Sequence, residues 1–360
     1  MNIFRSMMYN FNAGPSALPK EVTEAAARAI NNFNDSGLSI LEIGHRTPLF
    51  EDVMNEAQSL VKELMNLDDD HEVLFLHGGA TTQFMQIPMN LLDEDETVAI
   101  ADTGVWSGKA IDEAKCFGEV SIACSSKDKN YNYIPENIED IAGAKYFHLT
   151  TNNTIYGTQW KNIPKVNAPL VADMSSDILS RQMDFNSFDI IYAGAQKNAG
   201  AAGATLVIVN KNILGKIKRR VPPIMDYIKH IEAKSMLNTP PVFAIFVSML
   251  TLRWLKENGG VKAMEELNKE KSRILYEHID NSALFKGTVR KNDRSDMNVC
   301  FVMEDNLLEK RFLDFAKQNN IYGIKGHRLS GGFRVSLYNA TPLSSVQYLL
   351  EKMKAFENTI

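Results

Sequence analysis

Short runs of apolar and β-branched residues alternate with segments of helical periodicity from about residue 20 to residue 260. The runs are EVLFL near Val73, TVAIA near Val98, KYFHL near Tyr146, PLVAD ending at Asp173, FDIIYAG near Ile190 and ATLVIV near Val207. Between several of them lie segments such as EDVMNEAQSLVKELMNL, with apolar residues at helical spacing. Strands that alternate with helices favour a sheet with helices on both faces. The chain therefore predicts an α/β fold with a mostly parallel sheet.

The character of the sequence changes at Gly260, and 360 residues are enough for two domains. The segment TPPVFAIFVSMLTLRWLKENGG predicts a helix with Thr239 as its N-cap, Pro240 in the first helical position and an end at Gly259–Gly260. A charged helical stretch, the strand-like pieces MNVCFVM and GGFRVSLY and a terminal helix follow. We expect a large domain of residues 16–259 and a small α+β domain of residues 1–15 and 260–360.

Charge and composition exclude several classes of partner. A formal charge of −5 argues against nucleic acid, whose phosphates need a basic face, but is compatible with a small anionic substrate. The three cysteines form no C-x-x-C pair, which suits a reducing cytosol. The N-terminus shows no secretory signal, although Met7 and Met8 leave the start codon open, and the apolar stretch from Pro240 to Leu252 is too short to span a bilayer. We expect a cytoplasmic protein without a membrane partner or a metal site.

The segment IIYAGAQKNAGAAG carries the first candidate for chemistry. Lys197 follows a predicted strand that ends at Gly194, and Gly200 and Gly203 keep the next loop open. A lysine amine forms covalent links with carbonyl groups when an apolar pocket or a neighbouring cation lowers its pKa. On this segment alone, a solvated loop lysine is an equally good interpretation.

An aspartate closes the apolar run PLVAD. Asp173 falls at the carboxyl end of a predicted buried strand, where α/β proteins place their ligands. A buried lone carboxylate should face a cation, and in a pyridoxal enzyme that cation is the protonated pyridine nitrogen. The alternative is that Asp173 caps a helix.

A glycine pair in VLFLHGGATTQFMQ separates a predicted strand from a predicted helix. Backbone amides at a helix N-terminus, together with the hydroxyls of Thr81 and Thr82, can hold a phosphate group. An ordinary tight turn would have a similar sequence. Trp106 follows the TVAIA run and could cover a flat ring or fill a core, and Thr154 could bond a ring oxygen or close a turn.

Two His-Arg pairs indicate anion binding. His45 and Arg46 lie in SILEIGHRTPLF, and His327, Arg328 and Arg334 lie in IKGHRLSGGFRVSLY. Arginine binds carboxylates and phosphates through two parallel hydrogen bonds, so this set suits a substrate that carries both groups. Each pair by itself would more often lie on the surface.

These segments together resemble the phosphoserine aminotransferase family, a branch of the class V pyridoxal-phosphate-dependent aminotransferases. FNAGP, GHR, HGGATTQF, VADMSSDILSR, YAGAQKN, NTPP, KGHR and GGFRVSLYNA follow in the family's order and spacing over essentially the whole chain. The resemblance implies the type I aminotransferase fold, pyridoxal 5'-phosphate, and a homodimer with active sites at the subunit interface. It implies transfer of an amino group between L-glutamate and 3-phosphohydroxypyruvate, giving O-phospho-L-serine and 2-oxoglutarate, with 4-phosphohydroxythreonine as a further candidate substrate.

The resemblance also implies a role for each matching residue. Lys197 would carry the cofactor and Asp173 would pair with its pyridine nitrogen, while Trp106 stacks on the ring and Thr154 lies at its polar edge. The cofactor phosphate would be held by Ala80, Thr81 and Gln196, and by Asn238 and Thr239 of the neighbouring subunit. The substrate anions would be bound by His45, Arg46, His327, Arg328 and Arg334.

The sequence departs from the family pattern at two places. Thr81 stands where some members carry an arginine, and Gly200-Ala201-Ala202-Gly203 replaces the usual G-P-x-G.

Three rival functions are compared with this prediction. An alanine–glyoxylate aminotransferase would not need so many anion contacts. A cysteine desulfurase would need a reactive cysteine on a mobile loop, whereas Cys300 lies in a predicted strand. A binding or scaffold protein that lost activity is opposed by the intact lysine, aspartate and glycine loop.

Overall fold

A seven-stranded sheet forms the larger part of the computed structural model, which describes residues 8–360. From one edge to the other it contains β2 (His71–Leu76), β8 (Thr205–Asn210), β7 (Ile190–Gly194), β6 (Leu170–Asp173), β5 (Phe147–Thr150), β3 (Thr97–Asp102) and β4 (Glu119–Ser125). Only β8 runs antiparallel to its neighbours β2 and β7, and the other adjacent pairs are parallel. The predicted mostly parallel sheet is confirmed, and each of the six apolar runs contains one strand.

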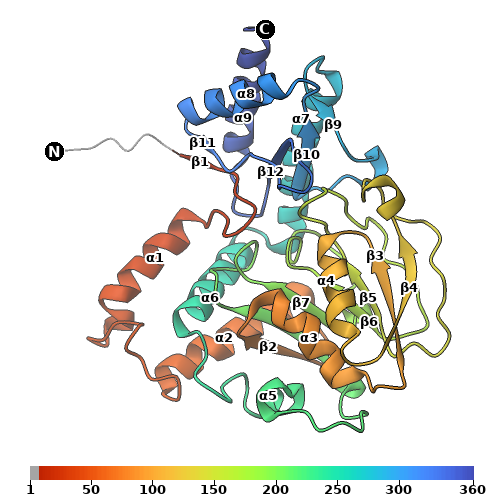
Figure 1. The fold of residues 1–360 in the computed structure, drawn as a ribbon. Helices are drawn as coiled ribbons and strands as arrows, with labels where there is room; N and C mark the ends of the chain where they lie inside the picture. The colour runs from red at the N-terminus through yellow and green to blue at the C-terminus, as the bar shows by residue number, and fades with distance from the viewer. Residues whose placement is uncertain (1–7) are drawn as a thin grey trace.

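Helices cover both faces of this sheet (Figure 1). One face packs against α2 (Pro48–Met65) and α6 (Val242–Glu257), with α1 (Lys20–Asn31) packed on α6, and the other against α3 (Gly79–Leu91), α4 (Val105–Ala114) and α5 (Tyr227–Glu232). The helix predicted in TPPVFAIFVSMLTLRWLKENGG is α6, and no helix within residues 8–360 is long and apolar enough to cross a membrane.

The predicted start of α6 was wrong. The helix begins at Val242, with Pro241 at its N-cap, so Thr239 and Pro240 lie outside it. A proline disfavours helical backbone angles in the residue before it. Because Pro241 restricts Pro240 in this way, the helix cannot begin until both prolines have passed.

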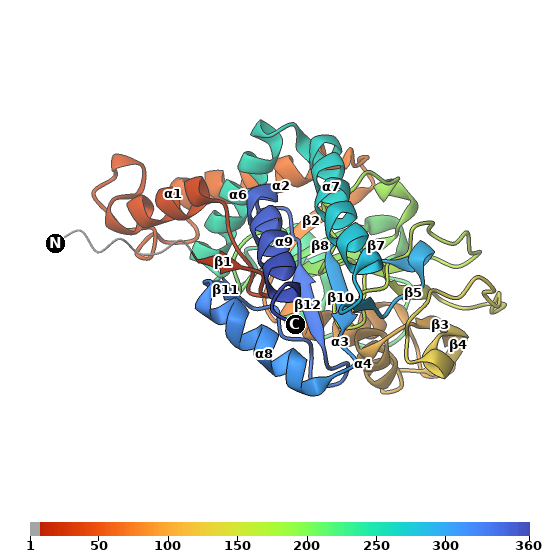
Figure 2. The same ribbon diagram turned by 90° about the horizontal axis from the view of Figure 1, so that it is seen from above.

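A second, smaller layer lies above the large sheet (Figure 1) and in front of it when the molecule is seen from above (Figure 2). It contains an antiparallel sheet with the strand order β12 (Phe333–Ser336), β10 (Asn298–Val302), β9 (Lys286–Gly287). A separate parallel pair is formed by β1 (Tyr9–Asn10) and β11 (Ile321–Tyr322). The helices here are α7 (Gly260–Asn281), α8 (Asn306–Gln318) and α9 (Leu343–Glu357). Their buried side chains form a separate core that includes Phe11 from the N-terminal segment.

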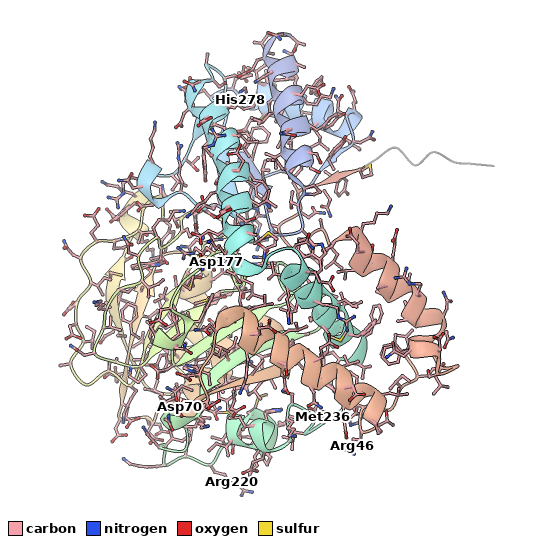
Figure 3. The ribbon with its side chains drawn as sticks, turned by 180° about the vertical axis from the view of Figure 1, so that it is seen from behind. Arg46, Asp70, Asp177, Arg220, Met236 and His278 are labelled. Atoms are coloured by element: carbon pink, nitrogen blue, oxygen red, sulfur yellow. The ribbon has the colours of Figure 1, made fainter. Side chains whose placement is uncertain are left out.

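The division into a large domain of residues 16–259 and a small domain of residues 1–15 and 260–360 stays a prediction. Residues 1–7 of the predicted small domain lie outside the described part of the chain. The long helix α7 runs upward from beside the large sheet, near Asp177, to His278 in the smaller layer (Figure 3). Short 3-10 turns complete the chain at Phe33–Asp35, Lys127–Lys129, Phe185–Ser187, Lys211–Ile213, Pro223–Met225 and Lys291–Asp293.

Candidate active site

A cavity of about 410 Å³ lies where β5, β6 and β7 end and the smaller layer begins. Such a position, at the carboxyl ends of parallel strands, is where ligands bind in open α/β sheets. Half of the residues that line the cavity are ones the sequence singled out. They are Ala80, Thr81, Trp106, Thr154, Asp173, Gln196, Lys197, His327 and Arg334.

The amine of Lys197 is held inside this cavity. Its Nζ donates a hydrogen bond of 3.0 Å to Thr154 Oγ1 and lies 5.8 Å from the centre of the Trp106 ring. Burial lowers the pKa of Lys197 to about 8; the charge of Asp173 opposes this shift and the charge of Arg334 adds to it. A lysine with such a pKa is neutral far more often near pH 7 than a solvated one, so it is suited to attack a carbonyl carbon.

A glycine fixes the path of the Lys197 stem. A Cβ atom at Gly14 would lie 3.3 Å from Lys197 Cγ, and the φ of Gly14 is +135°, which side chains rarely tolerate. Two residues after Gly14, Ser16 donates a hydrogen bond of 2.6 Å from its Oγ to the Lys197 carbonyl oxygen. The N-terminal segment therefore packs directly against the candidate catalytic lysine.

Asp173 is the last residue of β6 and is buried, with 4% of its surface exposed. The Ser175 amide donates a hydrogen bond of 2.9 Å to Asp173 Oδ1, and Ser175 Oγ accepts one of 3.2 Å from the Gly194 amide. Burial raises the pKa of Asp173, while Ser175 and the positive charge of Lys197 lower it. A carboxylate in this setting is stabilised by a cation that enters the cavity, as a protonated pyridine nitrogen would.

The N-terminus of α3 forms a cradle on another wall. Gly78 and Gly79 have φ angles of 90° and 66°, and a Cβ atom at Gly78 would lie 1.8 Å from Thr82 Oγ1. This turn places Ala80 and Thr81 at the cavity, in the first turn of the helix. The first amides of a helix have no partners within it and carry partial positive charge, so they suit a phosphate group.

Arg334 and His327 reach the cavity from the smaller layer. Arg334 lies on β12 and donates a hydrogen bond of 3.3 Å from Nη1 to the Thr154 carbonyl oxygen. Its Nε is buried without a partner among residues 8–360, so it remains available to a ligand. Burial, together with the charges of Arg334 and Arg328, lowers the pKa of His327. Arg328 itself is exposed and does not line the cavity.

Besides Arg328, four predicted residues do not line the cavity of their own chain. Arg46 is exposed at the edge of the molecule, well apart from Asp177 (Figure 3). His45 is half-buried, and its Nε2 has no partner within the described residues. The remaining two are Asn238 and Thr239; the Thr239 carbonyl oxygen is 2.9 Å from His77 Nε2.

Sequence reasoning missed several residues of the site. Thr150, Asn152, Ser175 and Ser176 line the cavity, as does Gly14. Only Met174 separates the two serines from Asp173 in VADMSSD, so their position was an available signal. Thr150 is opposite Asp173 in the strand register, and its Oγ1 is buried without a partner within residues 8–360. Such an atom indicates that this wall contacts a polar ligand.

The residues present fit pyridoxal 5'-phosphate. The site combines a lysine of lowered pKa, a buried carboxylate, an aromatic ring and a helix N-terminus. Another buried polar atom, Trp106 Nε1, also lacks a partner within the described part of the chain. Residues 8–360 contain no group of three or more His, Cys, Asp and Glu side chains that could hold a metal ion.

Comparisons with known proteins agree with this chemistry. A family model described as aminotransferase class-V matches residues 8–349. The phosphoserine aminotransferase of Flavobacterium johnsoniae is 53% identical, with 98% of this chain and 99% of the relative covered. The solved phosphoserine aminotransferase of Bacillus circulans subsp. alkalophilus is 41% identical with a TM-score of 0.96, and 98% and 99% of the two chains are covered. The solved enzyme of Trichomonas vaginalis, which is bound to PLP, is 36% identical with a TM-score of 0.92 and coverage of 97% and 100%.

Proposed function

Because the chain belongs to the aminotransferase class-V family, we propose that it is a pyridoxal-phosphate-dependent phosphoserine aminotransferase. It transfers an amino group between L-glutamate and 3-phosphohydroxypyruvate, giving O-phospho-L-serine and 2-oxoglutarate. Identity of about half of all residues with such enzymes along the whole chain is the observation that carries this proposal. The reaction belongs to L-serine biosynthesis, and we place it in the cytoplasm.

The cofactor supplies an aldehyde carbon that accepts amines and a ring that takes up the electron pair released at the substrate Cα. Lys197 would hold it covalently, and Asp173 would keep its ring nitrogen protonated. Trp106 would cover one face of the ring, and Thr154 would lie at its polar edge. Ala80, Thr81 and Gln196 would hold its phosphate at the N-terminus of α3.

Lys197 moves the proton in this reaction. An amine with a pKa of about 8 can take a proton from the substrate Cα and release it again near neutral pH, as a general base and then a general acid. The hydrogen bond to Thr154 Oγ1 supports this role, since it holds the amine inside the cavity between transfers.

Arg334 binds the α-carboxylate common to both substrates. Its position on β12 beside Thr154 and its unpartnered Nε support this assignment. The distal group is a γ-carboxylate in glutamate and a phosphate in the other substrate. Both are anionic, so His327 and Arg328, joined by His45 and Arg46, can bind either.

The second pair comes from another subunit in this proposal. His45 and Arg46 lie outside the cavity of their own chain, and Arg46 is exposed at the edge of the molecule. A homodimer that brings this edge to the mouth of the neighbouring cavity would complete the anion site. Asn238 and Thr239 of the neighbouring subunit would then add contacts to the cofactor phosphate.

The residues present do not suit the rival functions. Cys300 is buried on β10, and burial raises the pKa of its thiol to about 12, so it is not the reactive cysteine of a desulfurase. An alanine–glyoxylate aminotransferase would have no use for a distal anion site.

A coupled assay tests the substrate assignment. The enzyme is supplied with glutamate and either 3-phosphohydroxypyruvate or glyoxylate, and 2-oxoglutarate is measured. We expect turnover with the phosphorylated acceptor at least about a hundredfold more efficient, because glyoxylate leaves the distal cationic residues without a partner. Equal efficiency, or a preference for glyoxylate, would contradict the proposed substrate.

A further inference from the structure

A fully buried lysine lies in the middle of α7 without an acidic partner. Lys271 is 0% exposed, and its Nζ donates three hydrogen bonds to the carbonyl oxygens of Leu337 (3.0 Å), Tyr338 (2.9 Å) and Thr341 (3.2 Å). Among residues 8–360 no carboxylate forms an ion pair with it. Burial lowers the pKa of Lys271 to about 7, but the geometry suits the charged form, because only an ammonium has three donors and each one here meets a backbone carbonyl.

These carbonyls belong to residues 337–341, which form most of the short connection between β12 and α9. The connection contains no helix or strand, so most of its backbone groups depend on contacts with other parts of the chain. An apolar side chain in place of Lys271 would leave the buried carbonyl oxygens of Leu337 and Thr341 without this donor, whereas the Tyr338 oxygen would keep its hydrogen bond of 2.8 Å from the Thr341 amide. The segment would then rearrange to reach other donors or water.

Segment 337–341 contacts the neighbourhood of Lys197 from two sides. On one side, the Asn339 amide donates a hydrogen bond of 3.0 Å to Asn198 Oδ1, and Asn198 directly follows Lys197. On the other side, the Tyr338 hydroxyl donates one of 2.9 Å to the Ala13 carbonyl oxygen. Ala13 precedes Gly14, which packs against the Lys197 stem.

The same segment is fixed against the rest of the protein by further buried contacts. Asn339 Nδ2 donates to the Leu179 carbonyl oxygen at 3.0 Å, and Asn268 Nδ2 donates to Asn339 Oδ1 at 2.9 Å. Asn268 precedes Lys271 by three residues on α7. One face of α7 therefore sets the position of the segment that in turn contacts both sides of the candidate catalytic lysine.

We propose that Lys271 is a positioning residue of the active site, whose ammonium holds segment 337–341 in the arrangement that fixes Lys197. This inference rests on the proposed role of Lys197 as the lysine that carries the cofactor. If Lys271 only stabilised the fold, replacing it would change only the stability of the protein against unfolding. If it positions the active site, replacing it would also change the pKa and reactivity of the Lys197 amine.

The test compares three substitutions. Lys271→Met keeps an unbranched stem of similar length and removes the donors. Asn198→Ala leaves the three carbonyl contacts intact and removes the contact with Asn339, together with longer contacts from Asn198 Nδ2 to the Ser176 carbonyl oxygen (3.5 Å) and Met297 Sδ (3.8 Å). Tyr276→Phe is the matched control, because it removes a buried hydrogen bond of 3.0 Å from the same helix to the Ser295 carbonyl oxygen, which is not part of segment 337–341.

The readout uses the protein freed of cofactor. Trinitrobenzenesulfonate modifies neutral lysine amines, and peptide mass spectrometry gives the rate at Lys197 at each pH. We expect Lys271→Met and Asn198→Ala to move the midpoint of this rate profile upward, toward that of a solvated lysine, because a loosened site admits water. With cofactor restored, both should lower kcat about tenfold to a hundredfold with little change in KM. Tyr276→Phe should lower Tm and leave the midpoint in place.

A double-mutant cycle distinguishes one connected path from two separate effects. If Lys271 acts through Asn198, the double variant should be no worse than Lys271→Met alone. An unchanged midpoint in Lys271→Met, with only a lower Tm, would overturn the proposal. If that variant does not fold, Asn198→Ala alone decides, and an unshifted midpoint there overturns it. Failure of the proposed function would look different, because borohydride would then attach the cofactor of the unaltered protein somewhere other than Lys197.

Discussion

Lys197 Nζ lies 3.0 Å from Thr154 Oγ1 and donates a hydrogen bond to it, although the two residues come from different strand ends of the large sheet. The backbone of Thr154 also accepts the hydrogen bond from Arg334 Nη1. One residue therefore connects the amine proposed to carry the cofactor with the guanidinium proposed to bind the substrate carboxylate. The charge of Arg334 is one reason that the pKa of Lys197 is low, after burial itself.

Reaction of the cofactor-free protein with pyridoxal phosphate should depend on pH through Lys197. Only the neutral amine attacks the aldehyde, and the pKa of Lys197 is lowered to about 8, so the rate should rise as pH increases through 8 and level off above it. Arg334→Ala removes a positive charge that disfavours the ammonium, so the pKa should rise and the profile should move to higher pH. Stopped-flow absorbance measures both profiles. A downward movement would contradict this electrostatic account.

Asp173→Ala should weaken cofactor binding. The substitution leaves a protonated ring nitrogen in a buried site without its counter-charge, and removing one partner of a buried ion pair costs about 3–5 kcal/mol, or about a hundredfold or more in affinity. Equilibrium dialysis against pyridoxal phosphate gives the dissociation constant. Asp173→Glu keeps the negative charge and should lose less affinity for the cofactor. If the Asp173→Ala variant binds the cofactor as tightly as the unaltered protein, the proposed pairing is excluded.

Gly78→Ala should damage the phosphate cradle. The added Cβ would meet Thr82 Oγ1 at 1.8 Å, and the φ of 90° is strained for alanine, so the first turn of α3 must shift. We expect cofactor affinity to fall about tenfold or more, with a smaller loss of stability. Gly108→Ala in α4 is the control, because nothing lies within 4 Å of its added Cβ and its φ is not positive. It should bind cofactor normally and be slightly more stable, by about 0.4–1 kcal/mol.

Hybrid dimers should test the origin of His45 and Arg46. Lys197→Ala and Arg46→Ala should each be nearly inactive alone. If Arg46 serves the neighbouring subunit, refolding the two together should restore activity, because a hybrid dimer contains one site with both Lys197 and Arg46 intact. Random pairing puts half of the dimers in the hybrid form, each with one working site, so about a quarter of the unaltered activity is expected. No recovery would place Arg46 in its own subunit's site.

Much of the fold could be predicted from hydrophobic runs, and the misses have local causes. Strand β4 (Glu119–Ser125) was not among the predicted runs, because it is an edge strand with a half-exposed pattern that includes Ile122 at 42% exposure. The antiparallel direction of β8 was also not foreseen. Its connection to β7, residues 195–204, is too short for the crossover that a parallel pair requires, so the sequence did contain that signal.

The chemical core of the site could be predicted because it lies at the ends of recognisable strands. Asp173 and Lys197 each follow an apolar run, and the cavity brings them together. Contacts made by distant segments could not be predicted from local patterns. Ser16 contacts Lys197 across a separation of 181 residues, and the glycine at position 14 is required only because the lysine stem passes beside it. Nothing near Lys271 in the sequence indicates that its ammonium meets three carbonyls of a segment more than 60 residues away.

The most direct test of the account is the covalent position of the cofactor. The purified protein is saturated with pyridoxal phosphate, reduced with borohydride, digested and analysed by peptide mass spectrometry. We predict a single stoichiometric adduct, on Lys197 in the peptide that contains YAGAQKN. An adduct on another lysine, or no adduct in protein that still catalyses the transfer, would contradict the assignment of Lys197.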